Sequence, residues 1–240
     1  MDYLFSTDHS TDYWRFLKIY DKLKTHKIIN HNDPLLDSIQ QDIIYNKDAA
    51  LAYFLSEYID YKRHLMQQII ISSKNYKYAY LFAANIKGAD IQALQNIVIN
   101  SGSLKYICLF GCFINGANKS KIEKLIIASN NPKYACAWMQ NSKSCNINKL
   151  KNIIIKAKKP QPMFLFECAK LLTDQKDIKA IETKIIKSGS LKYIRLFATH
   201  INGANIKRLE KVVLNSGNMK EIKKFAKIKG SIMSNFGLLI

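Results

Sequence analysis

The sequence predicts an all-α protein, a right-handed α-solenoid of helical-hairpin repeats of about 28–30 residues each. Three observations support this: a recurring aromatic motif, a turn glycine that recurs at the same spacing, and a scarcity of turn-forming residues. The 240 residues include only 9 glycines and 4 prolines, whereas 48% are hydrophobic. Such a chain can bury a core, but it has too few turn residues for a β-sandwich or a β-barrel.

The first helix of each repeat is marked by a lysine, a tyrosine directly after it, and a second aromatic residue four positions later. The copies are Lys77–Phe82, Lys105–Phe110, Lys133–Trp138 and Lys192–Phe197, with degenerate copies at Ala50/Phe54 and Phe164/Cys168. In the first copy Tyr78, Leu81, Phe82 and Ile86 form one helical stripe. We expect the aromatic columns to form the core; a stacking platform for nucleic-acid bases is the alternative.

A glycine turn and a capped second helix complete each repeat. Gly88, Gly116 and Gly203 recur at the place where a left-handed residue would end the first helix. The positions predicted to cap the second helix are Asp90, Asn118, Asn146 and Asn205. The turn glycine is missing at Ser144 and around Thr173-Asp174.

A two-helix unit of this length cannot bury both of its apolar stripes alone, so it must stack on its neighbours. We therefore predict solenoid repeats over residues 46–229, about six to seven units. Residues 1–45 fit the register poorly and are predicted to be N-terminal capping helices, with a loop from His26 to Pro34. A last first-helix is expected at 218–229, and residues 230–240 are predicted to be a C-terminal tail or cap.

The repeated pattern of Lys-Tyr-x-x-x-Phe, Gly-Ala-Asp/Asn-Ile and Ser-Gly resembles the uncharacterised tandem helical-repeat proteins of giant, mimivirus-like DNA viruses. The resemblance covers about residues 46–229. It implies a helical-repeat fold and a viral origin. It implies no catalytic residue, because the shared positions are a core aromatic, a turn glycine and helix caps.

The formal charge of +19 is unevenly distributed along the chain. Residues 1–60 hold six basic and ten acidic side chains, whereas residues 61–240 hold 31 basic and eight acidic ones. Such an asymmetry indicates a polyanionic partner for the later part of the chain.

Two columns of basic residues recur about once per repeat. The first precedes the core tyrosine and consists of Lys77, Lys105, Lys133 and Lys192; the second lies on the second helices and consists of Lys121, Lys149, Lys179 and Arg208. Stacked helices would align each column into a ladder that attracts phosphates. We therefore predict a nucleic-acid-binding scaffold without sequence preference, because arginine, the usual base-reading residue, is scarce. A solvated lysine-rich face on a protein–protein adaptor is the alternative.

No metal, cofactor or catalytic site is expected. Cys108 and Cys112 share a helix face and Cys136 is the repeat equivalent of Cys108, a set that could form a three-thiolate metal site; the alternative, which we favour, is that they are buried structural thiols. The five cysteines include no C-x-x-C pair, and the five histidines show no paired spacing.

The remaining enzymatic reading is a DNA glycosylase-like helical-repeat enzyme. Its candidate acids are Asp90, Asp174 and Asp177, but helix capping explains them better. The odd cysteine count, together with no apparent secretory signal or membrane span, predicts a reducing intracellular compartment, which would be the host cytoplasm or a virion if the protein is viral.

Overall fold

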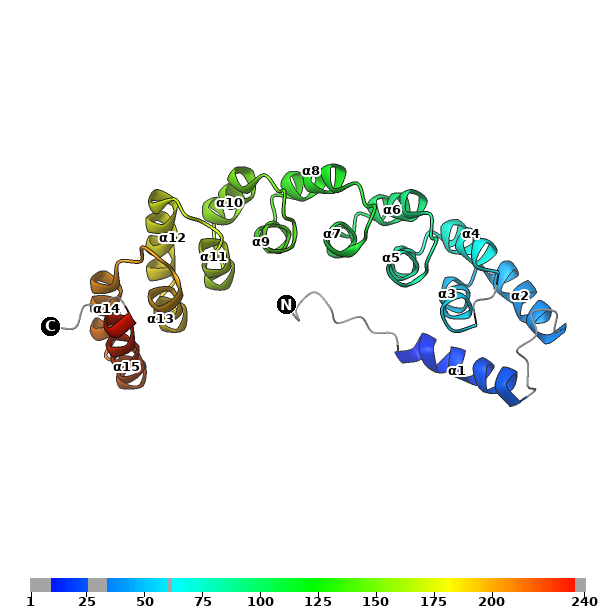
Figure 1. Ribbon diagram of the computed structural model, residues 1–240, viewed down its shortest axis with the longest axis horizontal. Helices are drawn as coiled ribbons and strands as arrows, with labels where there is room; N and C mark the ends of the chain where they lie inside the picture. Colours follow the sequence, from blue (N-terminus) through cyan, green and yellow to red (C-terminus); the bar gives the residue numbers. More distant parts are fainter. Residues whose placement is uncertain (1–9, 26–33, 60–61, 236–240) are drawn as a thin grey trace. The chain divides into compact units, whose positions relative to one another are not determined.

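The computed structural model describes residues 10–25, 34–59 and 62–235, and these residues form fifteen α-helices and no strand (Figure 1). The helices are α1 (Ser10–Thr25), α2 (Pro34–Asn46), α3 (Ala49–Tyr58), α4 (Arg63–Ser73), α5 (Tyr76–Asn85), α6 (Ile91–Asn100), α7 (Leu104–Phe113), α8 (Lys119–Ser129), α9 (Pro132–Asn141), α10 (Ile147–Lys156), α11 (Pro162–Ala169), α12 (Gln175–Lys187), α13 (Leu191–His200), α14 (Ile206–Asn215) and α15 (Met219–Asn235). The prediction of an all-helical fold is confirmed over these residues.

The chain divides into two compact units, Met1–Lys124 and Leu125–Ile240, and the boundary falls inside α8. Within each unit the helices alternate between two layers. In the first unit α3, α5 and α7 form one layer, which we call the A helices, and α4 packs on α6 in the other layer, the B helices. In the second unit α9, α11, α13 and α15 are the A helices, and α10, α12 and α14 are the B helices, of which α10 packs on α12. This packing of consecutive hairpins is consistent with a helical repeat.

The predicted helix caps form as expected. The side-chain oxygens of Asp90, Asn118, Asn146 and Asn205 each accept the backbone N–H of the third residue of the following helix, at 3.0–3.1 Å. Gly88 adopts a φ of +81°, a left-handed conformation that costs glycine little. It lies in the turn, three residues beyond the last residue of α5, and does not end the helix directly.

The aromatic columns are largely internal. Every member of the second column, which is Phe82, Phe110, Trp138, Cys168 and Phe197, is buried. In the first column Tyr78, Tyr106 and Phe164 are buried, whereas Tyr134 and Tyr193 are half-buried. The burial of the second column favours its role as core over that of a stacking platform, because buried rings cannot stack on nucleic-acid bases.

The two ends of the described chain differ from a regular repeat. Near the N-terminus, Phe16 of α1 stacks on Phe54 of α3 with ring centroids 5.0 Å apart, so α1 packs against the first A helix of the first unit. Near the C-terminus, α15 runs to Asn235, so the predicted tail boundary at residue 230 falls inside a helix. The predicted loop residues 26–33 and the final residues 236–240 lie outside the described residues.

A buried polar residue on the B helices links successive repeats, and the sequence analysis did not identify it. Its side-chain oxygen accepts the backbone N–H of the cap residue 23 positions later, in the next repeat. These bonds, which we call the clasp, join Gln67 to Asp90 at 2.8 Å, Gln95 to Asn118 at 2.7 Å and Glu182 to Asn205 at 2.8 Å. All three acceptor side chains are buried. The clasp therefore fixes the spacing of adjacent hairpins with a bond that apolar packing alone does not supply.

Candidate polyanion-binding surface

The excess positive charge is concentrated in the second compact unit. Residues 1–124 hold 15 basic and 12 acidic side chains, whereas residues 125–240 hold 22 basic and only six acidic ones. Six carboxylates cannot neutralise 22 cations, whichever pairs form. The surface of the second unit is therefore strongly positive at neutral pH.

At least five of these six carboxylates are engaged within the unit itself. The contacts join Gln140 and Lys170 to Glu167, the backbone N–H of Lys176 to Asp174, Lys151 to Asp177, Arg208 to Glu182, and Arg195 and Lys224 to Glu221. Carboxylates held in this way serve caps and local ion pairs. They are less able to screen the other lysines of the same surface, so a negatively charged partner would meet little repulsion there.

The structure places the second predicted column less regularly than the sequence indicated. Lys121, Lys149 and Arg208 are each the third residue of their helices, whereas Lys179 is the fifth residue of α12. Lys179 is therefore rotated away from the position that the other three share. In α12, which has 13 residues where α10 and α14 have 10, Ala180 and not Lys179 directly precedes the buried Ile181, as Lys149 precedes Leu150 and Arg208 precedes Leu209.

Two members of this column also have internal contacts. The Arg208 guanidinium lies 3.3 Å from Oε1 of the buried Glu182 and 3.2 Å from the Thr183 hydroxyl. The Lys121 ammonium lies 3.4 Å from the Asn96 side-chain oxygen. Arg208 therefore stabilises the fold and is a poor choice for a mutation that tests binding.

The first predicted column has a different local geometry. Each ammonium lies over the ring of the tyrosine that follows it in sequence, at 5.4 Å for Lys77, 5.5 Å for Lys105, 5.6 Å for Lys133 and 5.5 Å for Lys192. The ring face attracts the cation and holds it near the start of the A helix. These lysines therefore lie on the A helices, whereas the lysines of the second column lie on the helices of the other layer.

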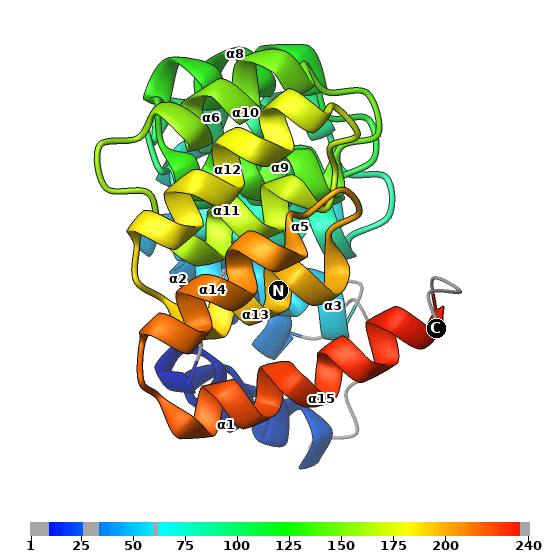
Figure 2. The same ribbon diagram turned by 90° about the vertical axis from the view of Figure 1, so that its left-hand side faces the viewer.

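The B helices of the second unit carry exposed lysines on successive elements. Helix α12 packs on α10 and is joined to α14 through the Glu182 contacts. Figure 2 shows α12 between α10 and α14. Lys149 of α10, Lys179 of α12, and Lys207 and Lys211 of α14 are all exposed. None of these four forms an ion pair with any residue that the structure describes. We call these four residues the lysine surface.

The candidate catalytic and metal-binding groups have structural roles. Asp90 and Asp174 cap helices, and Asp177 pairs with Lys151. The hydrogen bond with Cys112 and burial together raise the pKa of the Cys108 thiol, and burial is the main cause that raises the pKa of Cys168 to about 12. A raised pKa opposes formation of the thiolate, which is the form that a metal ligand or a nucleophile requires.

Within the ranges that the structure covers, no group of three or more histidine, cysteine, aspartate or glutamate side chains could hold a metal ion. The same residues include no helix with the length and apolar character that crossing a bilayer requires. Comparisons with family models, with curated proteins and with solved structures find no match.

Glu221 gives a testable dependence of stability on pH. Its carboxylate accepts from Lys224 at 2.7 Å and from Arg195 at 3.3 Å, and the Lys224 bond is the main cause that lowers its pKa. A carboxyl with a lowered native pKa stabilises the fold above its unfolded pKa and loses that effect as the pH falls through the native value.

We therefore expect Glu221→Gln to lower the thermal midpoint at pH 7, and the midpoints of the parent and the variant to converge as the pH falls below about 4. Thermal denaturation followed by circular dichroism at several pH values measures this difference. Lys220→Gln, an exposed neighbouring change, is the control and should show little effect. A midpoint difference that stays constant from pH 7 to pH 3 contradicts the assigned role of the carboxylate.

Proposed function

We propose that this chain is a non-enzymatic helical-repeat scaffold that binds a polyanion, and that the polyanion is a nucleic acid held by its phosphates. We further propose that the repeats stack as a right-handed α-solenoid in which the B helices share one face. The five free cysteines fit a reducing intracellular setting.

The observation that carries this proposal is the charge of residues 125–240 together with the engagement of their carboxylates. A unit with 22 basic and six acidic side chains repels itself unless salt or a partner neutralises it. The lysine surface supplies ammonium groups on three successive B helices. Ammonium groups that bind the phosphates of a nucleic acid displace the cations condensed on those phosphates, and this release favours association.

Lysine in place of arginine indicates contact with the backbone of the nucleic acid and not with its bases. Only four of the 37 basic residues are arginine, and two of these, Arg195 and Arg208, already pair with glutamates. Base reading in the major groove depends on the two-pronged hydrogen bonding of guanidinium or amide groups. We therefore expect similar affinity for different sequences of equal length.

The test is a binding titration with duplex and single-stranded nucleic acid at several salt concentrations. Fluorescence anisotropy of the labelled nucleic acid measures binding. If about four phosphates are engaged, the logarithm of the affinity should fall against the logarithm of salt with a slope of roughly −3 to −4. Replacing Lys149, Lys179, Lys207 and Lys211 together by glutamine should flatten that slope and weaken every sequence alike.

A second quadruple variant is the matched control, because it removes the same charge from the same unit. It replaces Lys133, Lys192, Lys220 and Lys223 of the A helices α9, α13 and α15 by glutamine. The control should keep most of the salt slope. If the two variants bind identically, total charge and not the lysine surface determines binding.

Protein–protein adaptor is the second candidate function, and exposed aromatic residues in the first unit favour it. Tyr45 on α2 is 89% exposed, Trp14 on α1 is 64% exposed and Tyr58 on α3 is 50% exposed. Large exposed aromatic side chains are enriched where proteins contact one another. If the folded parent protein binds no nucleic acid even at low salt, the adaptor becomes the leading function.

A further inference from the structure

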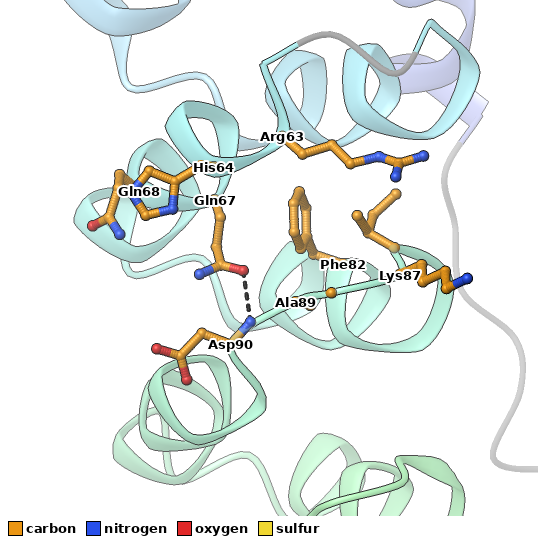
Figure 3. A pocket seen from close by; sticks show the side chains of 10 residues that line it. Arg63, His64, Gln67, Gln68, Phe82, Lys87, Ala89 and Asp90 are labelled. Carbon is orange, nitrogen blue, oxygen red and sulfur yellow. Dashed lines mark hydrogen bonds between the residues drawn. The ribbon is translucent and has the colours of Figure 1, made fainter.

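A pocket of about 320 Å³ lies in the first unit, between the start of α4 and the turn that joins α5 to α6 (Figure 3). Its floor includes the buried side chains of Phe82 and Ile86. Its polar lining includes Arg63, Gln67 and Lys87. A pocket of this size lies within the range of small-molecule sites.

At the equivalent glycines of two other repeats, side chains of the second helix of the preceding repeat lie close to the turn. In the next repeat, Gln92 of α6 donates its amide to the carbonyl of Gly116 at 2.9 Å, and the Ile91 side chain lies against the same glycine. In the second unit, Gln175 of α12 lies against Gly203. Gly88, the equivalent glycine at this pocket, has no side chain near the position of an added Cβ. The residues of α4 at the positions of Ile91 and Gln92 are Arg63 and His64, which line the pocket and do not reach within 4 Å of that position.

A buried donor in the pocket wall lacks a partner. Gln67 is 5% exposed, and its side-chain oxygen accepts the backbone N–H of Asp90. In the part of the chain that the structure describes, its amide nitrogen donates to no protein acceptor. Figure 3 shows this nitrogen turned into the space between His64, Gln68 and Asp90. A buried amide donor without a partner is costly, so a bound acceptor at this place would stabilise the site.

The charged groups separate to two sides of the pocket. Figure 3 shows the Arg63 guanidinium and the Lys87 ammonium extending to the same side. The Asp90 carboxylate, which accepts the Ala93 N–H, lies on the opposite side, the side to which the Gln67 amide nitrogen is turned. One side therefore suits an anionic group, and the other presents a donor next to an acceptor.

We propose that this pocket binds a nucleotide, with its phosphate on Arg63 and Lys87 and its base edge on Gln67 and Asp90. Guanidinium and ammonium groups are the usual partners of phosphate. Every nucleobase edge carries a donor beside an acceptor, which matches the carboxylate and the amide N–H. This site is separate from the lysine surface, so the inference does not depend on the proposed function.

The test is isothermal titration of the full chain with AMP and CMP, and with inorganic phosphate and ribose 5-phosphate as probes of the anion alone. We expect the nucleotides to bind at least about tenfold more tightly than either probe, because the probes leave the base-edge groups unpaired. Arg63→Gln and Lys87→Gln, both at exposed positions, should each weaken nucleotide binding about tenfold.

Gln67→Glu tests the base edge without removing the clasp. A glutamate can accept the backbone N–H as Glu182 does at its own repeat, but it lacks the amide donor. It should weaken nucleotide binding, whereas Gln95→Glu, the same change one repeat later, should not. The quadruple glutamine variant of the lysine surface should bind nucleotides as the parent does.

Three results would overturn the inference. They are no binding of nucleotides at millimolar concentration, equal binding of phosphate and nucleotides, and unchanged nucleotide binding in Arg63→Gln and Lys87→Gln. Weak nucleotide binding that is lost in the lysine-surface variant also counts against the pocket, because it assigns the contact to that surface. Thermal midpoints of all variants separate lost binding from lost folding.

Discussion

Replacing Phe110 by alanine is expected to lower the free energy of unfolding by about 3–5 kcal/mol. The side chain is 0% exposed and lies in the middle of α7, with its ring centroid 6.5 Å from that of Tyr80 on α5. Removing the ring loses its transfer energy and leaves a cavity, and the flanking helices can close over such a cavity only in part. Chemical denaturation followed by far-UV circular dichroism measures the change.

Phe113→Ala is the matched control, because it makes the same change one turn further along the same helix. Phe113 is 43% exposed, so its truncation should cost about 1 kcal/mol or less. If both variants lose the same stability, Phe110 is not part of a packed core. That outcome would restore the reading of the aromatic column as a platform for bases.

The sequence predicted those parts of the fold that depend on local chemistry. The helical stripes, the turn glycines and the caps at Asn118 and Asn205 each depend on a few adjacent residues, and repetition made them visible. The clasp was missed because its acceptor and its donor lie 23 residues apart and the donor is a backbone N–H, which has no side-chain signature. The spacing of 28 residues between Gln67 and Gln95 was the available signal.

The position of Lys179 shows a second limit of reading repeats by spacing. The steps from Lys149 to Lys179 and from Lys179 to Arg208 are 30 and 29 residues, close to the period. Lys149 and Arg208 directly precede the buried Leu150 and Leu209, yet Lys179 is one helical position away from the residue that directly precedes the buried Ile181. A helix residue turns by about 100° per position, so a near match in spacing does not ensure a shared face.

The candidate sites were predictable only in part, for a related reason. Net charge can be counted from the sequence, but whether a carboxylate such as Glu182 neutralises a surface lysine or supports a buried bond depends on the fold. The pocket beside Gly88 was not predictable either, because it depends on what neighbouring side chains leave unfilled. A motif can be recognised by its residue types, whereas no residue type marks a place where side chains leave a cavity.

Glu182→Ala is the second substitution with a large expected effect, a loss of about 2–4 kcal/mol of unfolding free energy. The carboxylate is 1% exposed, accepts the Asn205 backbone N–H at 2.8 Å and lies 3.3 Å from the Arg208 guanidinium. Alanine leaves the N–H without its acceptor, leaves the cation without its carboxylate, and opens a cavity between α12 and α14. Because the Arg208 side chain is 45% exposed, water recovers part of the ion-pair loss.

Two further variants separate the hydrogen bond from the charge. Glu182→Gln keeps an acceptor for Asn205, as Gln67 and Gln95 do in their repeats, and should cost only about 1 kcal/mol. Arg208→Gln leaves a buried carboxylate without its cation, so its cost should fall between those of the two Glu182 variants. Chemical denaturation gives the three values, and hydrogen exchange at the Asn205 amide reports the clasp directly. If Glu182→Gln destabilises as much as Glu182→Ala and exposes that amide equally, the ion pair and not the clasp holds these two repeats together.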